Sequence, residues 1–149
     1  MSERVIEVAI EVETDKISES KILELFRILE KCPFYTIPPG DLSIAVVDES
    51  TICKLHQEFL EDPTPTDVIT FPGDAEADFA GEIAVSIDQA IKEYSQHGNT
   101  FEEELFLYLI HGWLHLAGED DLEEFARQRM RAAEAKVLGW LNDASRKID

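Results

Sequence analysis

The chain has 149 residues, a formal net charge of −19, and 44% hydrophobic and 9% aromatic residues. This length fits one domain, and the hydrophobic content is typical of a globular protein rather than a disordered one. No apolar run approaches the roughly 20 residues that a membrane-spanning helix needs, and no signal-peptide pattern is present. We therefore predict a single domain over residues 1–149, located in the cytoplasm, where Cys32 and Cys53 stay reduced.

The negative charge is concentrated in the middle of the chain. Residues 55–126 contain one lysine and 18 acidic side chains, whereas residues 127–149 have a net charge of +3. The middle should attract a cation and repel a bare polyanion, while nucleic-acid binders usually carry a basic patch. Arg127, Arg129 and Arg131 are spaced two apart, so they cannot share one helical face and are expected to be scattered surface charges.

The first half of the chain predicts two strands, each followed by a helix. Alternating apolar and polar residues indicate a strand within residues 4–12, and residues 42–47 indicate a second strand. A helix capped by Ser18 or Ser20 should follow the first strand, and a helix that ends near Phe59 should follow the second. The apolar residues expected to face the core are Ile22, Leu25, Phe26, Leu29, Ile52, Leu55 and Phe59.

The second half predicts a strand pair and three helices. Strands are expected at 68–71 and 81–86, joined by an acidic, mobile loop at 73–79. Helices are expected over about 87–96 and 122–141, with a further helix between them. The residues expected to face inward in the last helix are Phe125, Met130, Val137 and Leu138. This order predicts an α+β domain with a four-stranded mixed sheet packed against about five helices.

The most informative pattern lies in the helix over residues 101–116. Thr100 and Glu103 have the spacing of a capping box that begins a helix, and most faces of this helix are apolar. His111 and His115 lie one turn apart on one side, where both imidazoles can reach one cation. Because buried polar groups need partners, these histidines should be either hydrogen-bonded core residues or metal ligands, and their spacing favours a metal.

The residues that follow the histidine pair strengthen the prediction of a metal site. Gly118 can adopt a left-handed conformation, end the helix and turn the chain back, so that Asp121 supplies a third ligand. Two imidazoles, a carboxylate and an open position make a hydrolytic metal site. Zincin proteases place a glutamate directly after the first histidine, whereas this chain has Gly112, which argues against peptide hydrolysis and suggests close packing on the sheet.

Three segments resemble the YbeY family, bacterial rRNA maturation factors with endoribonuclease activity. The family signature H-G-x-L-H-L-x-G-Y-D-H is similar to H-G-W-L-H-L-A-G-E-D-D, which begins at His111 and has Glu119 in place of tyrosine. The segment P-T-D-V-I-T-F-P at 65–72 resembles the family's P-T-D-V-L-S-F-P, and G-E-I at 81–83 resembles G-D-I. The late helix also fits, so the resemblance spans nearly the whole chain.

The resemblance implies that His111, His115 and Asp121 hold one divalent cation, expected to be Zn²⁺. The family's third ligand is histidine, and the carboxylate of Asp121 is a competent substitute that weakens the preference for zinc over manganese or iron. The adjacent Asp120 could ligate instead, or orient a ligand histidine. The family has an arginine at the position of Leu60, so a charge that would stabilise a transition state at phosphate is missing.

The implied activity is cleavage of single-stranded RNA during small-subunit rRNA maturation and ribosome quality control. The expected partners are the ribosomal small subunit, its rRNA and basic ribosomal proteins, with no role for DNA or a membrane. The catalytic residues remain unassigned: Glu82 and His56 are candidates, and Asp67 could line the site or only bond its turn. Leu60 favours an alternative, a non-catalytic, metal-stabilised assembly factor. The acidic rim is also compatible with a metal hydrolase for a small substrate.

Overall fold

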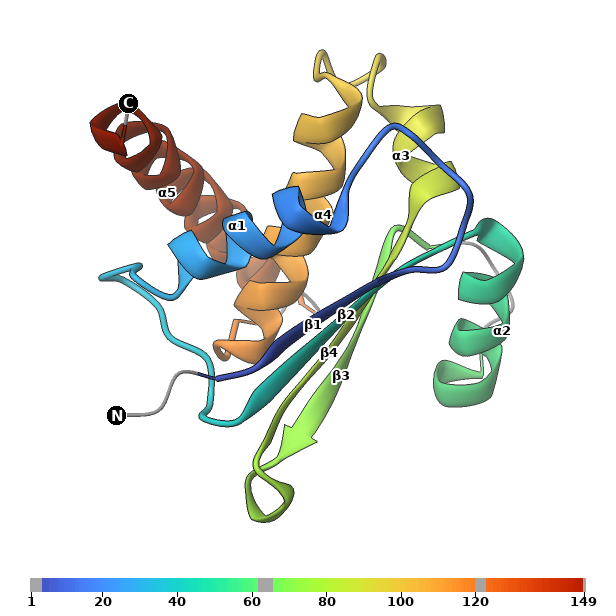
Figure 1. The fold of residues 1–149 in the computed structure, drawn as a ribbon, viewed down its shortest axis with the longest axis horizontal. Helices are drawn as coiled ribbons and strands as arrows, with labels where there is room; N and C mark the ends of the chain where they lie inside the picture. Colours follow the sequence, from blue (N-terminus) through green and yellow to red (C-terminus); the bar gives the residue numbers. More distant parts are fainter. Residues whose placement is uncertain (1–3, 62–65, 120–122, 149) are drawn as a thin grey trace.

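The computed structural model describes residues 4–61, 66–119 and 123–148. The predicted α+β fold is confirmed, because these residues form a four-stranded mixed sheet and five helices in one domain (Figure 1). The strands are β1 (Ile6–Ile10), β2 (Asp41–Val47), β3 (Val68–Asp74) and β4 (Phe79–Ser86). The helices are α1 (Glu19–Leu29), α2 (Glu49–Leu60), α3 (Ile87–Glu93), α4 (Phe101–Leu116) and α5 (Glu124–Ile148).

The sheet has the strand order β1-β2-β4-β3, with β3 at one edge. Strands β1, β2 and β4 run parallel, and β3 pairs with β4 in the antiparallel direction. The helical crossovers between parallel strands account for the placement of helices on both faces. Helices α1, α4 and α5 lie on one face, and α2 lies on the other (Figure 1). No helix in the described ranges is long and apolar enough to cross a membrane.

The two faces bury apolar clusters of different size. The larger cluster joins the sheet to α1, α4 and α5, and it includes fully buried residues such as Ile22, Leu29, Ile83, Leu109 and Val137. The smaller cluster lies under α2 and consists of Ala45, Val47, Ile52 and Ile69, with Leu55 and Phe71 partly buried against it. The α2 face is therefore thinly covered, and the C-terminal turn of α2 extends beyond its core.

Local capping signals in the sequence correspond to the observed helix starts. Ser18 accepts a hydrogen bond from the backbone N–H of Lys21, and Asp48 accepts one from that of Thr51. Thr100 begins α4 with a complete capping box. Such caps satisfy backbone N–H groups that have no partner inside the helix, so helix starts are encoded locally.

Several sequence-based boundaries and core assignments are wrong. The connection predicted at 73–79 is shorter in the structure: β3 continues to Asp74, which pairs with Phe79, and the residues between them include the 3-10 helix Ala75–Ala77. The polar residues of this segment indicated a loop, but backbone hydrogen bonds between strands can continue beyond the apolar core, since they do not depend on apolar side chains. Phe59 and Phe125 were predicted to face inward and are 60% and 68% exposed, because both lie outside the two apolar clusters that the described residues form.

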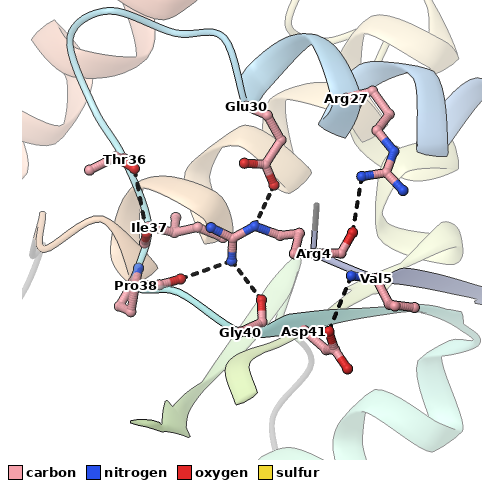
Figure 2. Close-up of polar contacts among 9 residues, drawn as sticks. All are labelled: Arg4, Val5, Arg27, Glu30, Thr36, Ile37, Pro38, Gly40 and Asp41. Atoms are coloured by element: carbon pink, nitrogen blue, oxygen red, sulfur yellow. Dashed lines mark hydrogen bonds and ion pairs between the residues drawn. The ribbon is translucent and has the colours of Figure 1, made fainter. Parts of the chain in front are cut away.

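A polar cluster fixes the segment that leads into β2 (Figure 2). The Arg4 guanidinium donates to the carbonyls of Pro38 and Gly40, both at 2.8 Å, and pairs with the Glu30 carboxylate at 2.5 Å. Arg27 in turn donates to the Arg4 carbonyl at 3.1 Å. These bonds tie α1, the start of β1 and the Pro38 turn together, and Pro38 forms part of the groove described next.

Candidate metal centre

Helix α4 brings His111 and His115 together at its C-terminal end. The ring centroids are 4.7 Å apart with an interplanar angle of 76°, and the two Nε2 atoms are 3.1 Å apart. Both rings are partly buried, while neighbouring residues of α4 are fully buried in the core. The predicted convergence of these two imidazoles is therefore present in the structure.

The opposite nitrogen of each ring has its own hydrogen-bond partner. Nδ1 of His111 lies 2.8 Å from the Glu134 carboxylate of α5, and Nδ1 of His115 lies 3.1 Å from the Glu119 carbonyl. An ionised carboxylate and a carbonyl can only accept, so both Nδ1 atoms carry the proton and donate. In the neutral rings, both Nε2 atoms then present lone pairs.

Two facing lone pairs at 3.1 Å repel each other unless a proton or a cation lies between them. Two nitrogen ligands of a tetrahedral zinc, each about 2.0–2.1 Å from the metal, are roughly 3.3 Å apart. Metal-bound histidines also characteristically donate their other N–H to a carboxylate or a backbone carbonyl. The donor set of His111 and His115 thus fits a divalent metal.

The turn after α4 has the conformation that the sequence predicted. Gly118 has a φ of +106°, and the Glu119 N–H donates to the Leu114 carbonyl at 2.9 Å. This reversal places the Glu119 carbonyl against His115. The predicted third ligand, Asp121, and its neighbour Asp120 lie outside the described residues. Within the described ranges, no group of three His, Cys, Asp or Glu residues is placed to hold a metal ion.

Gly112 allows α4 to pack closely against the sheet, as the sequence suggested. A Cβ atom at this position would lie 2.7 Å from Ile83 Cγ2 and 3.2 Å from Thr70 Oγ1. A real Cβ cannot approach so closely, so an alanine would push α4 away from β3 and β4. The missing side chain therefore sets the depth at which the histidines lie.

The histidines open onto a groove of about 700 Å³ that passes from α4 to α2 around the edge of β3. Its lining residues are Pro38, His56, Leu60, Thr66, Asp67, Val68, Thr70, Pro72, Gly73, Phe79, Ala80, His111, His115 and Leu116. Among the described residues that line this groove, three are histidines, one is a carboxylate and none is Lys or Arg. The hydroxyl of Thr70 is buried there without a hydrogen-bond partner among the described residues.

Asp67 both lines the groove and bonds its own turn, so the two roles considered from the sequence coexist. Its carboxylate accepts a long hydrogen bond of 3.4 Å from the Thr66 hydroxyl. Burial raises the pKa of Asp67 above its usual value, and the nearby His111 opposes that rise. Among the described residues that line the groove, Asp67 is the carboxyl, and it lies close enough to His111 for their charges to interact.

The structure separates the two candidate catalytic residues. His56 lines the groove together with the histidine pair, and so does Leu60, which is 59% exposed. Glu82 lies on β4 next to Ile83, whose side chain points toward Gly112 of α4. Because side chains alternate along a strand, Glu82 points to the opposite face of the sheet, away from the imidazoles. Burial and the charge of Glu11 raise the pKa of Glu82.

Sequence reasoning did not assign the residues that orient the imidazoles. Glu134 is 23 positions from His111, so no local spacing in the sequence connects the two residues. Glu119 contributes its backbone, and no side-chain pattern reveals a carbonyl. A carboxylate on α5 could be recognised as a partner of His111 only once the packing of α5 on α4 is known.

These features define an α+β protein with a candidate metal site in a groove at a sheet edge. Comparison with known proteins then places the chain: it belongs to the family described as Endoribonuclease YbeY, whose sequence model matches residues 6–142. The Endoribonuclease YbeY of Protochlamydia amoebophila is 44% identical over 105 residues, which cover 68% of this chain and 70% of that protein. The protein of the same name from Acidothermus cellulolyticus is 34% identical and covers 93% of this chain and 92% of its own length.

A solved structure supports the same fold. The solution structure of a protein from Thermotoga maritima is 32% identical to this chain and superposes with a TM-score of 0.59. The match covers 94% of this chain and 93% of that protein. The similarity therefore extends over the sheet, the helices and the histidine helix together.

Proposed function

We propose that this protein is a metal-dependent, single-strand-specific endoribonuclease of the cytoplasm, acting in small-subunit rRNA maturation and ribosome quality control. The main support is the pair of Nε2 atoms, 3.1 Å apart, of His111 and His115, which open onto a groove. Membership of the family described as Endoribonuclease YbeY gives this arrangement its reaction class.

In this proposal the chain holds one Zn²⁺ or a similar divalent ion through His111, His115 and Asp121. The bound ion would supply Lewis-acid activation of a water molecule or a phosphate oxygen. The Glu134 carboxylate and the Glu119 carbonyl fix the tautomer and the orientation of the two rings. His56, which lines the same groove, remains the candidate for proton transfer.

The proposed partners are the ribosomal small subunit and its maturing rRNA. With a net charge of −19, the chain is suited to dock on basic ribosomal proteins rather than to grip RNA phosphates directly. Binding to ribosomes should therefore be measured against salt concentration, beside binding to naked rRNA. Equal affinity for both at physiological salt would contradict docking through proteins.

The central test is cleavage of a single-stranded RNA by the purified protein with added zinc or manganese. His115→Ala should abolish metal-dependent cleavage, because one of the two converging ligands is removed. Glu119→Ala is the matched control, since the backbone carbonyl of residue 119 itself, which accepts from His115 Nδ1, is kept. Cleavage that survives His115→Ala unchanged would refute the proposed site.

A second function is favoured by Leu60, which lines the groove where the family resemblance implies arginine. A protein without this charge could act as a metal-stabilised assembly factor that does not cut RNA. Absence of cleavage, together with a large fall in melting temperature for His115→Ala, would support that function. Leu60→Arg should raise the cleavage rate if the protein is a nuclease.

A further inference from the structure

The wall of the groove beside the histidines includes the outer edge of the sheet, since β3 is the last strand in the order that the described residues form. The Ser86 N–H donates to the Asp67 carbonyl at 2.9 Å, which makes these residues a hydrogen-bonded pair of the antiparallel ladder. Because such pairs alternate, Ile69 and Phe71 direct their backbone groups toward β4. Val68 and Thr70 therefore direct their N–H and C=O groups outward, past the edge of the sheet.

The groove passes this outer edge, since it is lined by α4 on one face of the sheet and by α2 on the other. Both Val68 and Thr70 are among its lining residues. Pro72 is the next residue with an outward-facing backbone, and it has no N–H to donate. The outer edge thus offers a short row of donors and acceptors that ends at Pro72.

An exposed apolar rim stands beside this edge. Phe59 and Leu60 at the end of α2 are 60% and 59% exposed, and Leu60 lines the groove. The Phe59 ring meets the Phe71 ring edge-on, with centroids 5.0 Å apart, which holds Phe59 in place over β3. Outward backbone groups of Val68 and Thr70 and the apolar side chains of Phe59 and Leu60 together form what we call the β3–α2 wall.

The chemistry of this wall suits a nucleobase better than a phosphate. Tight binding of a phosphate backbone depends on Lys and Arg, and the described residues lining the groove include neither. An unpaired base has apolar faces that stack on side chains and an edge that exchanges hydrogen bonds with a protein backbone. A base inside a duplex has both its faces and its pairing edge occupied.

We propose that the β3–α2 wall binds an unpaired nucleobase of the RNA strand, next to the histidine pair. This inference rests on the proposed function, and it explains how an acidic chain selects single-stranded RNA without a basic groove. A peptide strand added to β3 is the competing occupant. Pro72 limits that pairing, and the apolar rim has no role in it.

The probe is a short single-stranded RNA with one 2-aminopurine base, compared with the same strand carrying an abasic site at that position. Binding is measured in the presence of a chelator, so that it does not depend on the metal or on cleavage. The abasic strand should bind roughly tenfold more weakly, and so should the intact strand to Phe59→Ala or Leu60→Ala. Phe34→Ala is the matched control, because Phe34 is 47% exposed outside the groove.

Two further readouts test the wall directly. Backbone amide signals of Val68 and Thr70 should shift with the intact strand and not with the abasic one. Affinity should fall only weakly with salt, whereas Leu60→Arg should steepen the salt dependence by about one phosphate contact. Equal affinity for intact and abasic strands, or displacement of the RNA by a blocked hexapeptide of alternating valine and threonine, would overturn the inference.

These outcomes separate the inference from the proposed function. Base-dependent binding without cleavage in added metal would support the wall and refute the nuclease. Metal-dependent cleavage with no preference for the intact base would support the nuclease and refute the wall.

Discussion

Helix α4 carries two polar clusters, two turns apart, that solve the problem of burial in different ways. Near its start, the Glu104 carboxylate is 0% exposed and accepts hydrogen bonds from His97 at 2.7 Å and Asn99 at 2.8 Å. Near its end, His111 and His115 turn two lone pairs toward each other. In the first cluster donors meet an acceptor, whereas in the second two acceptors meet.

The difference distinguishes a structural cluster from a binding site on one helix. A carboxylate whose oxygens are all matched by donors holds the α3–α4 connection in place and requires no ligand. Facing acceptors require a cation or a proton between them, and the partners of the Nδ1 atoms hold the rings in that arrangement. Four predictions test this contrast, in order of decreasing effect.

The largest effect is expected for metal-linked stability at the histidine pair. Zn²⁺ at a thousand times its dissociation constant should stabilise the wild-type fold by about 4 kcal/mol, and His115→Ala should lose this gain. Thermal unfolding with zinc and with chelator measures both. An equal zinc-dependent rise in melting temperature for the variant would show that the ion binds elsewhere.

The next effect is expected at the matched cluster. Glu104→Ala should lower the free energy of unfolding by about 3 kcal/mol, because the buried Tyr108 hydroxyl and the partly buried Asn99 amide lose their acceptor and a cavity opens. Urea unfolding measures the loss. Glu102→Ala is the control: its exposed ion pair with Lys21, at 3.0 Å, should contribute less than about 1 kcal/mol. Zinc affinity should stay unchanged in both variants.

A smaller effect is expected from Glu134, which in the proposed site would act on the metal only through its hydrogen bond with His111. Glu134→Ala should weaken zinc affinity roughly 10- to 100-fold, because the ring loses the acceptor that fixes its tautomer. Competition with a zinc-sensitive dye measures the change. Asp143→Asn on the same helix is the control, and an unchanged affinity in Glu134→Ala would remove this carboxylate from the site.

The smallest effect is a pH dependence of the structural cluster. The hydrogen bond to Glu104 and the charge of that carboxylate raise the pKa of His97 above 6.5. The contribution of protonated His97 to the stability of the fold is therefore complete below pH 6.5 and is lost as the pH rises through the raised pKa. Burial raises the pKa of Glu104, but hydrogen bonds from Asn99, His97 and Tyr108 outweigh it and lower the pKa below 4.5. The contribution of the ionised Glu104 carboxylate to stability is lost as the pH falls through its lowered pKa.

Both contributions are therefore present together between pH 4.5 and pH 6.5. The stability difference between wild type and His97→Gln should be largest in that window and shrink at higher pH. Urea unfolding at several pH values measures the difference. A difference that grows steadily up to pH 9 would show that the protonated His97 is not the stabilising form.

Features that depend on nearby residues could be predicted from the sequence. The capping box of Thr100 and Glu103, the histidine spacing and the turn at Gly118 are all local, and the structure has each of them. The alternating strands and periodic helices also specified the α+β class, because their apolar faces must pack on one another.

Features that depend on packing between distant elements could not be predicted. The spacing of Phe59 and Phe125 fits a buried helix face, yet both side chains lie outside the apolar clusters of the described residues, and a single sequence does not reveal where a core ends. Glu82 lies on the strand that packs against the histidine helix, but side chains alternate along a strand, so Glu82 points to the face of the sheet opposite the histidines. The ligand role of Asp121 stays a prediction, since that residue lies outside the described ranges.

The bond between Glu134 and His111 also bears on the order of events during synthesis. Helix α5 emerges from the ribosome after every other element named here, and domains generally fold as units, so this fold is not complete before Glu134 has been made. A nascent chain that has completed α4 but not Glu134 carries both imidazoles with one of them unanchored. Premature termination at that stage would leave a fragment that lacks the acceptor of His111, so the proposed metal site would be incomplete in unfinished chains.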